Sequence, residues 1–75
     1  MNYKNIFSSR LFALRKESGL SQKALADILD LSDAAITMME KGRRSPSFEV
    51  LCALADYFDV SLDYLVGRSD DPKRH

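Results

Sequence analysis

The stretch from Ser21 to Pro46, SQKALADILDLSDAAITMMEKGRRSP, decides the fold of this 75-residue chain. Ser21 is a good N-cap, and apolar residues follow it at helical spacing, which predicts a short helix. These apolar residues are Leu25, Ala26 and Leu29. Asp30 tolerates a left-handed backbone better than most non-glycine residues, so it favours a tight turn. Ser32 then caps a second helix, and Asp33 places negative charge at the positive end of that helix.

The second predicted helix has two chemically different faces. Ile36 and Met39 are three residues apart and are expected to point into the core. The opposite face has no core to fill and is expected to face water or a partner. It carries Asp33, Ala34, Thr37, Met38 and Lys41. Gly42 ends the helix, and Arg43 and Arg44 follow on a loop. Two helices, a tight turn, a free face and then arginines are typical of a helix-turn-helix.

A longer series of residues recurs in a familiar order along the chain. The series is Arg10-Leu11, Leu14-Arg15, Gly19-Leu20-Ser21-Gln22, Leu25-Ala26, Leu31-Ser32, Ile36, Glu40-x-Gly42, Pro46-Ser47, Leu51, Leu54-Ala55 and Val60-Ser61. In these residues the chain resembles the Cro/lambda-repressor (XRE-type) helix-turn-helix family from about Phe7 to Gly67. The resemblance implies an all-α, compact five-helix domain with the helix-turn-helix at its second and third helices. It also implies a sequence-specific transcriptional regulator, a repressor, in the cytoplasm of a bacterium and encoded by it or by a phage.

The remaining sequence predicts three more helices and the domain boundaries. Residues 1–5 are expected to fray, with Asn5 as the cap of the first helix. One face of that helix carries Phe7, Leu11, Leu14 and Ser18. After Ser47 a fourth helix contributes core residues, namely Phe48, Leu51, Leu54, Ala55 and Phe58. A short fifth helix contains Leu62, Leu65 and Val66 and ends at Gly67. We expect an N-terminal arm at 1–6, the DNA-binding domain at 7–67 and a flexible tail at 68–75, with no internal repeat.

Composition limits the classes of protein that the chain can represent. Hydrophobic residues make up 45% and charged residues 29%, as in an ordinary soluble domain. No apolar run is long enough to cross a membrane, and we expect no signal peptide. The single Cys52 cannot form an internal disulfide and is expected to be a small hydrophobic residue, buried or half-buried, in a reducing cytoplasm. With no second thiol and only a terminal His75, we expect no metal, no cofactor and no enzymatic activity.

The charges of the chain sum to zero but are unevenly distributed. Residues 1–48 hold eight Lys/Arg against five Asp/Glu, a net charge of +3. Residues 49–75 hold three Lys/Arg against six Asp/Glu, a net charge of −3. The predicted binding half is therefore the positive side of a dipole, as nucleic-acid binding favours. Ordinary solvated surface charge is the alternative explanation.

The outer face of the second motif helix is the predicted base-reading surface, and the same positions carry base contacts in the family. Asp33 could accept from a cytosine amino group, or it could act only on the helix dipole. Ala34, Thr37 and Met38 could touch thymine methyl groups, although Met38 could also be exposed without a role. Lys41 completes the face.

Phosphate contacts are predicted beside this face. Gln22 begins the first motif helix, and the matching glutamine of the family contacts the DNA backbone. The other candidates are Arg10, Ser21, Lys23, Arg43 and Arg44. For the charged members the alternative is a solvated surface charge. Arg15 and Glu40 match an internal ion pair of the family, and the alternative is two independent surface charges.

Double-stranded DNA is the expected partner, with a palindromic operator read by a homodimer. The dimer surface is predicted at the fifth helix and its neighbours, with Tyr57, Leu62, Tyr64 and Val66. The alternative function is a protein-interaction module on the same scaffold, such as an antitoxin or an anti-repressor. Asp33, Met38 and the neutral total charge support that alternative.

Overall fold

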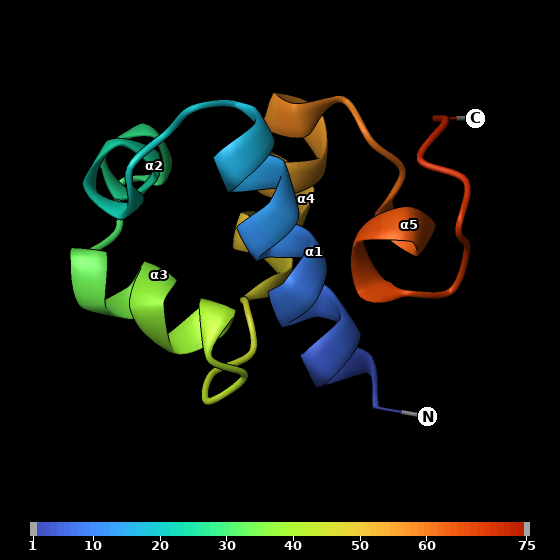
Figure 1. Cartoon of the computed structure of the whole chain (residues 1–75), viewed down its shortest axis with the longest axis horizontal. Helices are drawn as coiled ribbons and strands as arrows, with labels where there is room; N and C mark the ends of the chain where they lie inside the picture. The colour runs from blue at the N-terminus through green and yellow to red at the C-terminus, as the bar shows by residue number, and fades with distance from the viewer. Residues whose placement is uncertain (1, 75) are drawn as a thin grey trace.

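The computed structural model describes residues 2–74, and this part of the chain is all-α with five helices (Figure 1). The helices are α1 (Tyr3–Glu17), α2 (Gln22–Leu29), α3 (Asp33–Glu40), α4 (Phe48–Phe58) and α5 (Leu62–Val66). The predicted five-helix fold, with its helix-turn-helix at α2 and α3, is confirmed.

Helix α1 is central to the arrangement, because it contacts α3 on one side and α5 on the other. Helix α2 packs against α3 and α4, and α4 packs against α5. The domain measures 28 × 23 × 22 Å. Figure 1 shows α2 and α3 at one end of the long axis, with α5 and the C-terminal segment at the other end.

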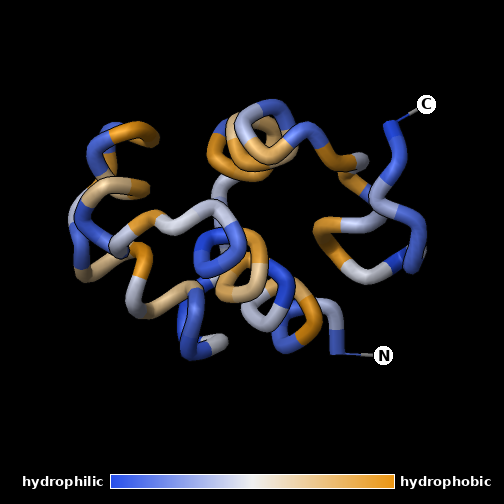
Figure 2. Tube along the Cα trace, turned by 45° about the horizontal axis from the view of Figure 1, so that its top comes forward, coloured by the Kyte–Doolittle hydropathy of each residue, from blue (hydrophilic) through white to orange (hydrophobic). Residues whose placement is uncertain are grey.

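The core receives large side chains from every helix. The fully buried ones are Leu11, Leu25, Ile36, Met39, Leu54 and Leu65. Figure 2 shows hydrophobic and hydrophilic segments alternating along the helices, as amphipathic helices around one small core require. The predicted inward position of Ile36 and Met39 is confirmed.

Four helices begin at a serine whose side-chain oxygen accepts a hydrogen bond from the backbone N–H three residues later. These N-caps are Ser21, Ser32, Ser47 and Ser61, with oxygen–nitrogen distances of 3.0, 3.1, 3.2 and 3.0 Å. Each cap satisfies one of the N–H groups that the first turn of a helix leaves without a partner. The serine positions therefore fix where the loops end and the helices start, as the sequence predicts.

The first helix starts earlier than the sequence prediction places it. Asn2 is the N-cap, and its Oδ1 accepts from the Asn5 N–H at 3.1 Å. Asn5 therefore lies inside α1, and the predictions that it caps the helix and that residues 3–5 fray are wrong. The predicted boundary between arm and domain at residue 6 also falls within α1. Met1 lies outside the described residues.

Phe48 is the second difference from the predicted structure, because its side chain is 74% exposed instead of buried. It is the first residue of α4, and a helical side chain leans toward the N-terminus of its helix. Phe48 therefore projects beyond the end of the core, while Leu54 and Ala55 in later turns are buried.

Residues 68–74 form no helix, yet several specific contacts hold them against the domain. The Pro72 carbonyl accepts from the Ser61 N–H at 3.0 Å. Arg74 pairs with Asp56 at 2.7 Å and with Asp59 at 3.7 Å. The sequence predicts a flexible tail here, and that prediction did not include these contacts. His75 lies outside the described residues.

The turns after α2 and α4 share one construction that the sequence reading did not detect. Residues 25–32 read LADILDLS, and residues 54–61 read LADYFDVS. Asp30 and Asp59 both take the left-handed conformation, with φ values of 56° and 55°. Leu31 N–H then donates to the Ala26 carbonyl at 2.8 Å, and Val60 N–H donates to the Ala55 carbonyl at 3.0 Å. Both corners therefore place an apolar residue and a serine cap directly after the left-handed aspartate.

Gly67 and Gly19 provide a matched test of how closely α1 approaches the end of α5. Both have positive φ, at +89° and +71°, so an alanine at either position should cost about 1 kcal/mol in backbone strain. A Cβ at Gly67 would also lie 2.9 Å from the Cβ of Ile6, whereas nothing lies within 4 Å at Gly19. We expect Gly67→Ala to lower the free energy of unfolding by roughly 1–3 kcal/mol more than Gly19→Ala. Urea denaturation measures this, and equal losses would contradict the close approach.

Candidate nucleic-acid interface

The outer face of α3 is open to solvent. Helix α3 packs against α1 and α2 through Ala35, Ile36 and Met39, all of which are buried. Among the residues predicted to face outward, those exposed are Asp33, Ala34, Met38 and Lys41. Thr37 is half-buried. The face is therefore available to a partner over the whole length of the helix.

A buried ion pair fixes α3 to α1. Arg15 Nε lies 2.6 Å from Glu40 Oε2, and Arg15 Nη2 lies 3.0 Å from Glu40 Oε1. The two side chains are only 9% and 5% exposed, and Arg15 Nη1 also donates to the Leu20 carbonyl at 2.8 Å. The hydrogen bond to Glu40 raises the pKa of Arg15, and the carboxylate charge adds to that effect, whereas desolvation opposes it. The predicted pair is confirmed, and its atoms form a bidentate contact.

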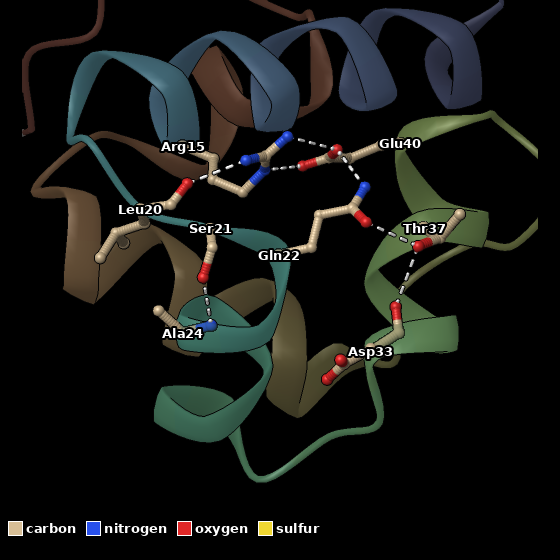
Figure 3. A network of polar contacts seen from close by, with 8 residues as sticks. All are labelled: Arg15, Leu20, Ser21, Gln22, Ala24, Asp33, Thr37 and Glu40. Carbon is tan, nitrogen blue, oxygen red and sulfur yellow. Dashed lines mark hydrogen bonds and ion pairs between the residues drawn. The ribbon is translucent and has the colours of Figure 1, made fainter.

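Glu40 also holds Gln22, the first residue of α2. Gln22 Nε2 donates to Glu40 Oε1 at 3.0 Å, and Gln22 Oε1 accepts from the Thr37 hydroxyl at 2.9 Å (Figure 3). The ionised carboxylate can only accept, so the amide nitrogen must point to Glu40 and the amide oxygen to Thr37. The other N–H of the carboxamide takes part in no hydrogen bond with the described residues.

The sequence reading missed these two contacts of Gln22. The residues are 15 and 18 positions apart, so no helical spacing connects them. They meet because the turn at Asp30 folds α3 back against the N-terminus of α2. Thr37 Oγ1 also lies 3.1 Å from the Asp33 carbonyl one turn earlier, so two acceptors within the protein surround that hydroxyl.

Basic side chains flank the exposed face. Lys41, Arg43 and Arg44 are exposed, and none of them takes part in an ion pair among residues 2–74. The Arg43 N–H donates to the Met38 carbonyl at 2.9 Å, which fixes the start of the loop to the end of α3. Lys23 is exposed on α2 and lies 3.7 Å from Asp27, a solvated pair of little energetic weight. Ser21 uses its oxygen as the α2 cap, and its hydroxyl proton remains able to donate.

Arg10 does not join this group, and its predicted role as a phosphate contact is not supported. Its guanidinium donates to the carbonyls of Tyr64 and Ser69 and pairs with Asp70 at 2.7 Å. It also lies 4.1 Å from the centre of the Tyr64 ring. The reason is its position on α1, because this side of the helix faces α5 and the C-terminal segment instead of α3. Arg10 is only 18% exposed and serves to hold that segment in place.

Other kinds of site find little support in the described residues. Residues 2–74 contain no group of three or more His, Cys, Asp or Glu side chains arranged to hold a metal ion. Cys52 is half-buried, as predicted. Every helix in this part of the chain is too short or too polar to cross a membrane.

Comparison with protein families places the motif in a known group. The sequence model of the helix-turn-helix family matches residues 11–65. Two relatives from Bacillus subtilis are the uncharacterized HTH-type transcriptional regulator YqaE and the HTH-type transcriptional regulator AnsR. YqaE is 39% identical over 88% of this chain, and AnsR is 42% identical over 79% of it. The chain spans only 58% and 51% of the lengths of these two relatives.

A solved structure shows the same fold with a nucleic acid. The P22 c2 repressor, crystallised with a synthetic operator, superposes with a TM-score of 0.79 at 31% sequence identity. The likeness covers 85% of this chain and 97% of the repressor chain. The shared fold therefore extends over nearly all of the P22 chain.

Proposed function

The chain belongs to the helix-turn-helix family, and we therefore propose that it regulates transcription by binding specific sequences of double-stranded DNA. The observation that carries the proposal is the exposed outer face of α3, which buried contacts hold in position and basic residues flank. A recognition helix of this kind lies in the major groove, and its early residues face the base edges. The residues that would face the bases are Asp33, Ala34, Thr37, Met38 and Lys41.

Phosphate contacts would position the helix in the groove. The remaining N–H of Gln22 and the hydroxyl of Ser21 lie at the N-terminus of α2, where backbone N–H groups also favour an anion. Lys23, Arg43 and Arg44 supply positive charge on either side of α3. These contacts would set the register of the domain on DNA without reading its sequence.

We further propose that the protein acts as a homodimer on a palindromic operator, because one motif reads only a few base pairs. Tyr57 and Leu62 are exposed near α5 and could contribute to the dimer surface, with Tyr64 and Val66 half-buried beside them. Repression is the proposed direction of regulation, and the likeness to the operator-bound P22 c2 repressor supports it. A regulator of this kind would act in the cytoplasm, where bacterial DNA is found.

Selection of bound sequences from random duplex DNA tests the proposal. We expect enrichment of a palindromic sequence at moderate salt. The logarithm of its affinity should then fall with the logarithm of salt concentration with a slope of about −0.9 for each phosphate contacted. Lys23, Arg43 and Arg44 alone would contribute roughly −2.7 per subunit. Absence of enrichment at every salt concentration would contradict the proposal.

That negative result would favour the second candidate, a protein-interaction module. Met38 is 41% exposed on α3, and a large apolar side chain on an open helix face suits a protein partner as well as DNA. The total charge of zero also fits a protein partner. In that case Met38→Ala should weaken capture of the partner, while added DNA should not compete.

A further inference from the structure

We propose that the first two turns of α3 recognise thymine methyl groups together with a cytosine or adenine amino group, and that they make no hydrogen bond to guanine. The proposal rests on the DNA binding proposed above and specifies which base edges the face selects. It follows from one property of Asp33, Ala34, Thr37 and Met38, here named the reading face. None of these side chains presents a hydrogen-bond donor to the groove.

Thr37 is the decisive residue, because its hydroxyl would normally be both donor and acceptor. The hydroxyl has a single proton, and two acceptors compete for it inside the protein. These are Gln22 Oε1 at 2.9 Å and the Asp33 carbonyl at 3.1 Å. Figure 3 shows the hydroxyl directed toward both groups. Thr37 therefore has no donor left for the DNA, and what it can offer is its methyl and the acceptor oxygen of the hydroxyl.

The Gln22 acceptor is held in place by groups that do not contact the DNA. Gln22 Nε2 donates to Glu40 Oε1, and the Glu40 carboxylate is fixed by the buried guanidinium of Arg15. Rotating the carboxamide by half a turn would set its oxygen against a carboxylate oxygen, which is repulsive. The stable orientation of the Gln22 carboxamide is therefore the one in which Oε1 accepts the Thr37 proton.

The other three side chains of the reading face also lack a donor. Asp33 is an exposed carboxylate and only accepts. Ala34 offers a methyl group, and Met38 offers a thioether that is at most a weak acceptor. The available donors, Lys41, Arg43 and Arg44, lie at the C-terminal end of α3 and in the following loop.

The major groove separates bases by this chemistry. Guanine presents two acceptors, N7 and O6, so an acceptor or a methyl group gains no hydrogen bond from it. Cytosine and adenine present an amino donor, and cytosine N4 is the usual partner of an aspartate. Thymine presents a C5-methyl, which packs against the apolar groups of Ala34, Thr37 and Met38. Each half-site should therefore place thymines opposite these three residues and an amino group opposite Asp33.

Substitution of thymine by deoxyuridine tests the proposal, because it removes the C5-methyl and preserves base pairing. On the selected duplex, each thymine is replaced in turn and the affinity is measured by fluorescence anisotropy. At one or two positions per half-site we expect affinity to fall about fourfold, the value of one buried methyl group. Flanking thymines outside the half-sites are the internal control and should show no change.

Two variants of Thr37 assign the effect to its methyl group. Thr37→Ser keeps the hydroxyl and removes the methyl, so the penalty for uracil at one position should fall to nearly onefold. Thr37→Val keeps a methyl and removes the hydroxyl, so the penalty should persist. The thymine-to-uracil ratio is measured within each variant, so a reduced fraction of folded protein does not affect it.

Three results would overturn the proposal. Uracil could be tolerated at every position of a duplex that is selected and bound. The penalty could follow the hydroxyl, with Thr37→Val losing it and Thr37→Ser keeping it. Replacement of a guanine in the half-site by 7-deazaguanine could weaken binding of the parent protein, and the size of that loss could change in Asp33→Asn or Thr37→Val. In each of these cases DNA binding itself stands, whereas failure to select any duplex would remove both proposals.

Discussion

Replacing Glu40 by glutamine is expected to lower the free energy of unfolding by roughly 3–5 kcal/mol, because it leaves the Arg15 guanidinium buried without its counter-charge. The two side chains are 9% and 5% exposed, so solvent cannot replace the lost partner. A domain of this size loses about 4–8 °C in Tm for each kcal/mol. A fall of at least about 12 °C in a thermal melt followed by circular dichroism is therefore expected.

Glu17→Gln is the matched control for Glu40→Gln. Glu17 is exposed at the end of α1, so the same chemical change there should alter stability by no more than about 0.5 kcal/mol. If Glu40→Gln does not fold, the double variant Arg15→Leu, Glu40→Leu should, because replacing both charges by apolar groups removes the stranded cation. Equal melting temperatures for Glu40→Gln and the parent would show that the pair contributes nothing.

The effect of Glu40→Gln should not depend on pH near neutrality. The pKa of Arg15 is raised in the folded state, so the stability it contributes is fully present below its unfolded value. That contribution is lost only as the pH rises through the folded value, and both values are strongly alkaline. The difference in free energy of unfolding between Glu40→Gln and the parent is measured from pH 7 to pH 9. Titration of Arg15 should not reduce that difference over this range.

Removing both arginines after α3, as Arg43→Ala with Arg44→Ala, should weaken binding to all DNA sequences by a similar factor. Both side chains are exposed and carry no ion pair among the described residues, so their charges are available for phosphates. The slope of log affinity against log salt should become less steep by about 1.8 per subunit, which is about 3.6 for the proposed homodimer, and affinity at low salt should fall on the order of tenfold per subunit. Anisotropy titrations on the selected duplex and on random duplex measure both quantities.

The opposite end of the molecule provides a control with the same change of charge. Arg68→Ala with Lys73→Ala also removes two positive charges, from exposed positions in the C-terminal segment. Figure 1 shows that segment far from α3. Removing these two charges should leave the slope of log affinity against log salt nearly unchanged. The double variant Arg43→Ala with Arg44→Ala could instead lose affinity for the selected duplex alone. That result would assign these arginines to base reading.

The features predicted correctly from sequence are those that a few adjacent residues determine. A serine cap, a left-handed Asp30 and the spacing of Ile36 and Met39 depend on local chemistry, and each is found as expected. The ion pair of Arg15 with Glu40 was foreseen only through the family resemblance, because 25 residues separate its members.

The errors arise where local patterns leave the answer open. Asn2 and Asn5 are both capable caps, and the local sequence does not indicate which one begins the helix. The spacing of Phe48 identifies the face of α4 correctly but not how far the core extends along that helix. Arg10 and Gln22 found partners 60 and 18 residues away, which only the folded chain brings together.

Positive charge without an ion-pair partner is concentrated at one end of the 28 Å axis of the domain. Lys41, Arg43 and Arg44 form no ion pair among the described residues, whereas Arg10, Arg68 and Arg74 at the other end are paired with carboxylates. A neutral molecule of this kind experiences almost no net pull toward a polyanion, but it does experience a torque that rotates its basic end forward. At 0.1 M salt the field is screened within about 10 Å, less than half the length of the molecule. Alignment would therefore occur only in the last step of an encounter, and lowering the salt should lengthen the distance over which a passing molecule is turned the right way round.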